Sequence, residues 1–221
     1  YLDGAHAAAS EGQRVLDAGG SALEAVVAAC VWMENDITFN TATGSALTRA
    51  GVVECDALVA TDDLRAGAVA AVSGVCNPVL LAKAVMDHTP HVVLAGPGAL
   101  ELARAWGIAL CDPAEQVTPR RLERYQQMME RGITYEGDPE RDMDNPSADA
   151  PHDTIGACAL DSDGHLAVAS SSGGIMLKCP GRMGDVPVIG GGNFCGPAGA
   201  VTYSGHGEAI MKICWAKYAY D

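Results

Sequence analysis

The chain has 221 residues, of which 48% are hydrophobic and 19% are charged, so a disordered chain is excluded and one globular domain with its own core is expected. The formal net charge is −14, which disfavours binding to nucleic acid or to an anionic membrane surface. No apolar run is long enough to cross a bilayer, and no signal peptide is visible at the N-terminus.

Eight cysteines are scattered along the chain, none with C-x-x-C spacing, and most lie within apolar runs. This usage predicts reduced, buried thiols in a cytoplasmic protein rather than a disulfide framework. The six histidines lie far from one another and from any paired cysteines, so a zinc site is not expected.

The first part of the chain alternates helix and strand signals. Ser21 and Glu24 have the spacing of a capping box and begin a helix whose apolar residues repeat on one face. Asn77 and Pro78 open another helix, because Asn caps helices and Pro is tolerated in the first turn. The predicted elements are, in order, helices at 10–16 and from 21, strands at 46–48, 52–60 and 66–75, the helix from 78, a strand at 91–95, and helices at 98–106 and 119–131.

Residues 132–153 differ in character from the rest. Acidic residues and prolines dominate and almost nothing is apolar, which predicts an exposed, flexible linker. The alternating acids at 138–144 resemble a calcium loop only weakly, because Pro139 interrupts them and the central glycine is missing. After the linker, strands at 154–160 and 165–171 flank a turn at 162–164 and form a predicted hairpin.

Two glycine-rich stretches do not predict phosphate binding. The strand that leads through Gly96 and Gly98 into a helix has Glu101 at the third glycine position, where a carboxylate would repel pyrophosphate. Residues 190–192 are three glycines without a following Lys-Ser or Lys-Thr pair, and they are better interpreted as a close approach of two backbone segments.

Thr154 lies where the acidic linker meets an apolar strand. It could simply start the strand. It could instead become an N-terminal nucleophile when the bond before it is cut, since a threonine alcohol needs an adjacent base and its own free α-amine, with a pKa near neutral, can be that base. Position alone leaves both interpretations open.

Several separated motifs bear on this choice. Together, and in this order, they resemble the plant-type asparaginases, also called isoaspartyl peptidases, which are N-terminal-nucleophile hydrolases. The motifs lie at 19–22, 39–40, 65–72, 77–78, 89–92, 152–156, 170–174, 180–185 and 204–208. The resemblance covers nearly the whole chain.

The resemblance implies a fold and an activity. The fold is an α+β, four-layer αββα sandwich formed by residues 1–221 as a single domain. Cleavage between Asp153 and Thr154 would yield an α chain of 1–153 and a β chain of 154–221, and two such αβ units would form a homodimer. The implied substrates are small molecules, namely L-asparagine and β-aspartyl dipeptides, hydrolysed through a Thr154 acyl-enzyme.

The resemblance also assigns roles to individual residues. Ser172 supports the nucleophile, Arg182 binds the substrate α-carboxylate as a planar bidentate cation, and Asp185 binds the α-ammonium. Ser204 and the Gly205 amide supply the oxyanion hole. The remaining assignments are Gly207 lining the ammonium pocket, Asn40 holding the site near the nucleophile, and a structural sodium ion on the backbone carbonyls of Met33, Glu34, Asp36 and Phe39. No other cofactor is implied.

The sequence departs from the family pattern in three ways. Ser172 and Ser204 replace threonines, Ala42 replaces the glycine of a Phe-Asn-Ala-Gly turn, and the family's first strand and last elements have no counterpart here. Two alternatives follow. One is a glycosylasparaginase, although that group carries Asn where Gly173 and His206 stand and is secreted. The other is a non-catalytic member acting as a binding module, which an intact Thr154, Arg182 and Asp185 oppose.

Overall fold

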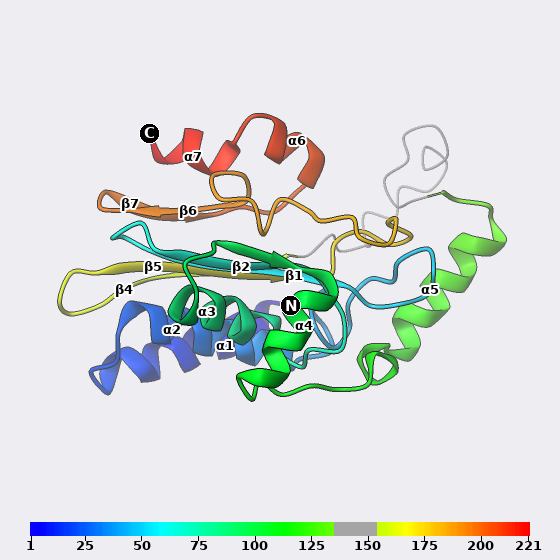
Figure 1. The fold of residues 1–221 in the computed structure, drawn as a ribbon, viewed down its shortest axis with the longest axis horizontal. Coiled ribbons are helices and arrows are strands. Elements are labelled where there is room, and N and C mark those ends of the chain that lie inside the picture. The colour runs from blue at the N-terminus through cyan, green and yellow to red at the C-terminus, as the bar shows by residue number, and fades with distance from the viewer. Residues whose placement is uncertain (135–153) are drawn as a thin grey trace.

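A computed structural model describes residues 1–134 and 154–221 and shows a mixed α/β protein (Figure 1). The elements run in the order α1 (Leu2–Asp17), α2 (Ala22–Glu34), β1 (Cys55–Thr61), β2 (Ala66–Val72), α3 (Pro78–His88), β3 (Val93–Ala95), α4 (Gly96–Ala105), a 3-10 turn (Pro113–Gln116), α5 (Pro119–Glu130), β4 (Ile155–Leu160), β5 (Leu166–Ser172), β6 (Asn193–Gly196), β7 (Gly199–Thr202), α6 (Gly207–Lys212) and α7 (Trp215–Tyr220). No helix in the described ranges is long and apolar enough to cross a membrane.

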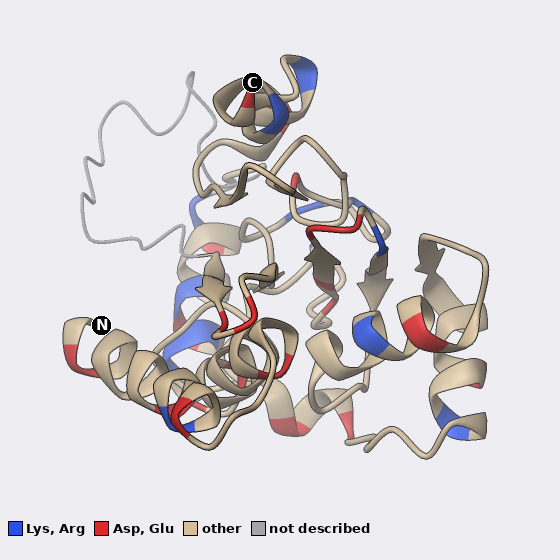
Figure 2. Cartoon of the chain, turned by 90° about the vertical axis from the view of Figure 1, so that its left-hand side faces the viewer, with Lys and Arg blue, Asp and Glu red and all other residues tan. Residues whose placement is uncertain are grey.

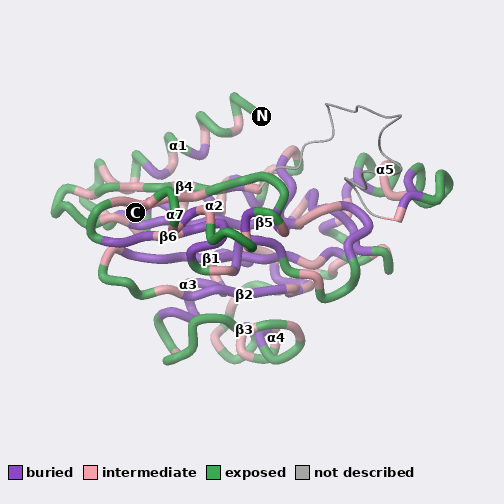
Figure 3. The backbone as a smooth tube through the Cα atoms, turned by 90° about the horizontal axis from the view of Figure 1, so that it is seen from above, coloured by how far each residue is buried: buried purple, intermediate pink, exposed green. Residues whose placement is uncertain are grey.

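A five-stranded sheet in the order β3-β2-β1-β5-β4 forms the centre of the molecule. Its pairs are antiparallel except for β2 with β3. Every residue of β1 is buried (Figure 3), because both faces of the sheet are covered. Val59 packs toward the helices and Leu58 toward the small second sheet, as the alternation of side chains along a strand requires.

The covering layers come from both halves of the chain. Helices α1, α2 and α3 lie on one face of the sheet (Figure 1). The two-stranded sheet β6–β7 packs on the other face, against β1 and β5, and α7 packs on β6 and β7. Charged residues of both signs are spread over the helices and loops (Figure 2).

Most of the predicted elements are confirmed. The hairpin pairs Ile155 with Ser171, and the capping box forms as predicted, with Ser21 Oγ accepting the Glu24 amide and the Glu24 carboxylate accepting the Ser21 amide. The first helix begins at Leu2 rather than at residue 10, because an alanine-rich stretch with high helix propensity precedes it.

Two local predictions are wrong. Leu47 and Val53 form only an isolated bridge, so the strands predicted at 46–48 and at the start of 52–60 do not exist as such. The linker does not begin at residue 132: Gly132, with φ of 67°, ends α5, and buried Ile133 donates back to the Met128 carbonyl (3.0 Å). Residues 135–153, with the linker and the rejected calcium loop, lie outside the described residues.

The cysteines are only partly as predicted. All eight are free thiols, and Cys30, Cys55 and Cys195 are buried. Cys158, Cys179 and Cys214 are exposed, so burial was wrongly expected for them. Cys158, for example, lies on β4 at the edge of the sheet, where an apolar sequence does not ensure that both faces of the strand are covered.

Glu34 at the end of α2 is a fully buried carboxylate that accepts the Val79 amide in the first turn of α3 (3.0 Å). Burial raises its pKa to about 7, against the opposing effect of hydrogen bonds from Ser171, Val79 and Asn77. The folded protein therefore holds this proton to a higher pH than the unfolded chain does. Its free energy of unfolding should fall as pH rises from about 4.5 to about 7.

A Glu34→Gln variant, which cannot ionise, should lose this pH dependence. Between pH 4.5 and 7.5, we expect the free energy of unfolding of the parent to fall by on the order of 3 kcal/mol relative to that of the variant. Urea unfolding of both proteins at several pH values measures the difference. Glu101→Gln, at an exposed position of α4, is the control. Identical pH profiles for the parent and Glu34→Gln would contradict the prediction.

Candidate active site

The β4–β5 hairpin places two hydroxyl groups side by side. Thr154 immediately precedes β4 and Ser172 ends β5, and the register that pairs Ile155 with Ser171 brings them together. The Thr154 hydroxyl donates to Ser172 Oγ at 3.2 Å, and Ser172 Oγ also accepts the Gly174 amide at 3.0 Å. Ser172 is therefore held by the backbone that follows it and can orient the threonine alcohol.

Asn40 fastens the turn after α2 to the end of β5. Its side-chain nitrogen donates to the Gly174 carbonyl, its side-chain oxygen accepts the Ala46 amide, and its backbone carbonyl accepts the Gly173 amide, each at 2.7 Å. Ala42, at the position where the family pattern has glycine, lies in the left-handed region with a φ of 40°. Asn40 thus stabilises the backbone beside Ser172.

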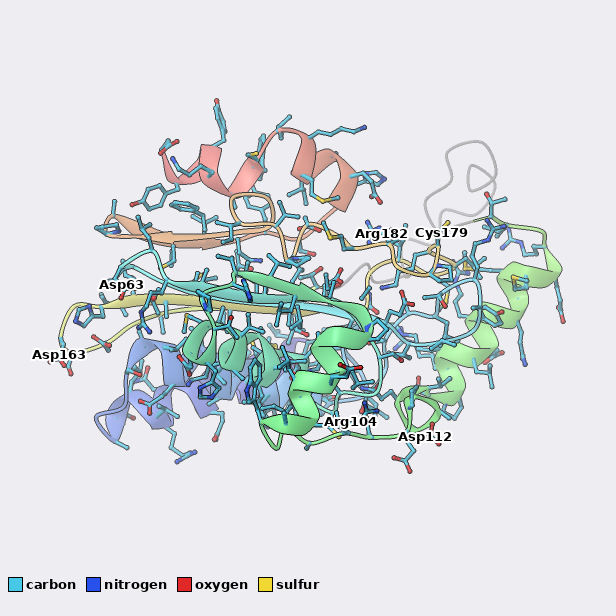
Figure 4. The ribbon with its side chains drawn as sticks, in the orientation of Figure 1. Asp63, Arg104, Asp112, Asp163, Cys179 and Arg182 are labelled. Atoms are coloured by element: carbon cyan, nitrogen blue, oxygen red, sulfur yellow. The ribbon has the colours of Figure 1, made fainter. Side chains whose placement is uncertain are left out.

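Arg182 lies on the loop between β5 and β6, at the opposite end of the sheet from Asp63 and Asp163 (Figure 4). Its Nε and Nη2 atoms both contact Glu208 Oε1 at 2.8 Å. Partial burial of Glu208 opposes its ionisation, but the hydrogen bond and charge of Arg182 lower the pKa of Glu208 overall. Glu208 thus occupies one edge of the guanidinium and fixes the direction of the other.

Three glycines surround the remaining part of the guanidinium. An added Cβ at Gly174 or Gly184 would lie 3.1 Å from Arg182 Nη1, and one at Gly207 would lie 3.0 Å from Nη2. Gly174 and Gly184 lie in the connection between β5 and β6 and Gly207 begins α6, yet all three leave the backbone close to the cation. The space that the missing side chains leave gives a small anion access to the nitrogens.

Asp185 is the second charged group of the site. Its side chain is buried, and its Oδ2 atom has no hydrogen-bond partner among the described residues. Burial raises its pKa, opposed by its own backbone amide and by the charge of Arg182. A desolvated carboxylate with an unused oxygen gains from a cation placed against it.

One cleft collects most of the predicted site residues. Its cavity volume is about 20 Å³, room for about one water molecule, so a larger ligand must displace side chains at its wall. The lining residues are Asn40, Thr154, Ser172, Gly174, Ile175, Arg182, Gly184, Asp185, Val186, Gly205 and Gly207. Ser204 is exposed and does not line the cleft, and Asp153 lies outside the described residues.

The glycines at 190–192 make the close backbone approach that was predicted. The Gly192 amide donates to the Asp185 carbonyl at 3.0 Å, and a Cβ on Gly192 would lie 2.6 Å from Asp185 Oδ2. This contact buries the Asp185 carboxylate from behind and leaves its other side toward the cleft.

Several carbonyl oxygens of the loop predicted to bind sodium take part in backbone contacts. The carbonyls of Met33, Glu34 and Asp36 each accept a backbone amide, at 3.2, 3.4 and 3.2 Å. The carbonyls of Ile37 and Phe39 instead converge on Gly44, where an added Cβ would lie 2.7 and 2.8 Å from them. Oxygen ligands of this kind suit a hard cation. The sodium site on the carbonyls of Met33, Glu34, Asp36 and Phe39 stays a prediction.

The residues that support the charged groups were not predicted from the sequence. Glu208 directly follows Gly207 within a motif already recognised, and Asp56 is a lone carboxylate inside the apolar run 55–60. A charged residue in a strand that is otherwise apolar usually has a specific partner. That signal could have identified Asp56, but not its partner.

The cleft thus has the parts of a hydrolase with a hydroxyl nucleophile: an alcohol beside a second hydroxyl, a guanidinium and a buried carboxylate. Comparison with known proteins agrees. The model of the asparaginase family matches residues 1–220, and the chain belongs to this family.

The relatives share this assignment. Isoaspartyl peptidase/L-asparaginase of Bos taurus is 42% identical over 96% of this chain and 67% of its own length, and that of Homo sapiens is 39% identical over 95% and 66%. Plant-type L-asparaginase of Thermococcus kodakarensis is 37% identical over the whole of this chain and 72% of its own length. The chain therefore spans about two thirds of the length of the curated relatives that it matches.

Proposed function

We propose that this protein is a threonine amidohydrolase that hydrolyses L-asparagine, β-aspartyl dipeptides or both. The observation that carries the proposal is a single cleft lined by Thr154, Ser172, Arg182 and Asp185. In this cleft, Thr154 Oγ1 lies 3.2 Å from Ser172 Oγ. The names of the relatives point to the same two substrate classes. Both substrates carry an α-carboxylate and an α-ammonium beside the amide that is cut.

The proposed reaction starts from a chain cut between Asp153 and Thr154. The freed α-amine of Thr154 takes the proton of its own hydroxyl as the oxygen attacks the amide carbon. Collapse of the tetrahedral intermediate breaks the C–N bond, the amine leaves with that proton, and an acyl ester remains on Thr154. Water then attacks the ester, releases aspartate and restores the threonine alcohol.

The surrounding groups fix the substrate for this attack. Arg182 Nη1 and Nη2 bind the α-carboxylate, and the Asp185 carboxylate binds the α-ammonium through Oδ1, the oxygen on the side of the cleft-lining Gly207. Ser172 orients the nucleophile, and the Gly205 amide stabilises the oxyanion. Binding charges of both signs at fixed positions selects free amino-acid amides over uncharged amides.

Further properties belong to the same proposal. The complete protein has the four-layer αββα arrangement, cleaves itself before Thr154, and forms a homodimer of αβ units. A sodium ion held by loop carbonyls would keep the turn that carries Asn40 in place. A cytoplasmic location is supported by the eight free cysteines, which a reducing compartment maintains.

The deciding experiment is an intact-mass spectrum of the purified full-length protein after incubation, combined with an assay for ammonia released from L-asparagine and for aspartate released from a β-aspartyl dipeptide. Two fragments that meet between Asp153 and Thr154, with release of either product, are expected. An uncut protein that releases neither product would overturn the proposal and favour the non-catalytic binding module.

Gly207→Ala tests the pocket around the charged groups. The added Cβ would lie 2.8 Å from Asp185 Oδ1 and 3.0 Å from Arg182 Nη2, where the substrate charges are expected to bind. We expect kcat/KM to fall at least about tenfold, mainly through KM, because one displaced charge contact corresponds to about 1.4 kcal/mol or more. Gly98→Ala, where an added Cβ meets nothing within 4 Å, is the matched control and should behave as the parent.

A further inference from the structure

Asp56 is a buried carboxylate in the central strand, only 1% exposed. Its strand neighbours Cys55, Ala57 and Leu58 are apolar and equally buried. In the antiparallel pairing of β1 with β5, Asp56 lies directly opposite Ser172. The backbone of this acidic residue is thus part of the same ladder that positions the hydroxyl groups of the cleft.

The Asp56 side chain reaches two other segments. Its Oδ1 atom accepts the Ala71 amide at 2.9 Å, and its Oδ2 atom accepts the Gly184 amide at 2.8 Å. Ala71 has a φ of 50°, and the pairing of β1 with β2 shifts register between Cys55 and Ala57. A carboxylate is suited to this position, because both of its oxygens accept, whereas an amide side chain offers one acceptor and would direct its own N–H groups at the other backbone amide.

Gly184 lies between Arg182 and Asp185, which bind the substrate charges in the proposed function and together form the substrate clamp. Arg182 precedes it by two positions and Asp185 follows it directly. An added Cβ on Gly184 would lie 3.1 Å from Arg182 Nη1 and 3.7 Å from Asp56 Oδ2, so the three groups are in close proximity. The hydrogen bond from the Gly184 amide to Asp56 therefore fixes the loop backbone between Arg182 and Asp185.

The charge of Asp56 has a buried counterpart. Lys178 is 1% exposed and donates to the Glu54 carbonyl at 2.7 Å. Burial lowers the pKa of Lys178, and the charge of Asp56 opposes this shift. The two opposite charges thus stabilise each other in the interior, which makes a buried carboxylate at this position tolerable.

We propose that Asp56 is a positioning residue that holds the loop of Arg182 and Asp185 in register with Thr154 and Ser172. Its backbone pairs with the strand of Ser172, and its side chain accepts a hydrogen bond from Gly184, between Arg182 and Asp185. The inference rests on the proposed function, because it assigns Asp56 a role in placing the groups that bind the substrate charges.

The test is the nearly isosteric Asp56→Asn substitution in the full-length protein, with steady-state kinetics on L-asparagine and a β-aspartyl dipeptide. The loss of one charge-assisted hydrogen bond predicts a rise in KM of about tenfold or more, with kcat changed by less than about threefold. Self-cleavage before Thr154 should persist, because it does not use the clamp. Thermal unfolding is measured in parallel.

Asp161→Asn is the matched control. Asp161 also accepts backbone amides through both carboxylate oxygens, from Ala22, Asp163 and His165, but lies at the far turn of the sheet. It should match the parent in KM. A KM for Asp56→Asn equal to that of the parent, or an equal rise in both variants, would overturn the role assigned to Asp56.

Hydrogen exchange of the parent keeps the inference testable if Asp56→Asn does not fold or if the parent shows no hydrolysis. The Gly184 amide, bonded to a buried carboxylate, should exchange at least about 100-fold more slowly than an amide in an exposed loop. Exchange as fast as in exposed loops would overturn the inference. A parent without hydrolytic activity but with a protected Gly184 amide would instead count against the proposed function alone.

Discussion

Replacing Thr154 by alanine is expected to lower the hydrolysis of asparagine and β-aspartyl dipeptides by at least about 1,000-fold, because the substitution removes the only group in the proposal that bonds to the substrate carbon. Self-cleavage should stop as well, since the same hydroxyl starts the acyl shift. Intact-mass spectrometry and product release measure the two effects separately.

The fold of the Thr154→Ala variant should remain. Thr154 contributes one hydrogen bond, to Ser172 Oγ, so the expected loss of stability is about 1 kcal/mol. Thr154→Ser is the control that retains both the hydroxyl and the α-amine, and it should still cleave itself and release product. Full activity of Thr154→Ala would exclude Thr154 as the nucleophile, whereas an inactive Thr154→Ser would show that the threonine methyl is also required.

Arg182→Lys should give the second large effect, although the positive charge is kept. Lysine cannot present two parallel donors to a carboxylate, and it also loses the paired contacts of Nε and Nη2 with Glu208. We expect kcat/KM for asparagine to fall about 100-fold, which corresponds to about 2.7 kcal/mol, with most of the change in KM.

The substrate β-alaninamide, which is asparagine without its α-carboxylate, makes this test specific. The parent should strongly prefer asparagine over β-alaninamide, and Arg182→Lys should lose most of that preference. Arg65→Lys alters an arginine in an exposed ion pair with Asp63 and should leave kcat/KM for both substrates unchanged. An undiminished preference in Arg182→Lys would show that another group binds the α-carboxylate.

Local chemistry made much of the fold predictable. The capping box of Ser21 and Glu24 and the hairpin that ends in Ser172 depend on neighbours a few residues apart, or on a short turn, so their sequence patterns determine their structure. The strands predicted around Leu47 and Val53 failed for the complementary reason. Strand formation depends on the partner strand, and these residues meet for only one bridge.

Motif order allowed the main site residues to be predicted, but not the geometry that joins them. Thr154, Ser172, Arg182 and Asp185 were all identified, and the fold brings them to one cleft. The exposed position of Ser204 could not be read from its motif, because exposure depends on which layers cover a loop.

The sequence by itself determined the family, the hairpin and the residues that can perform the chemistry, because each of these depends on particular residue types at short or fixed spacing. Only the tertiary structure decided that Glu208 holds the guanidinium of Arg182 and that Asp56 links the Gly184 loop to the strand of Ser172. Asp56 and Gly184 are 128 residues apart in the chain. A hydrogen bond over such a separation leaves no periodic pattern in the sequence, since it forms only after the layers have packed.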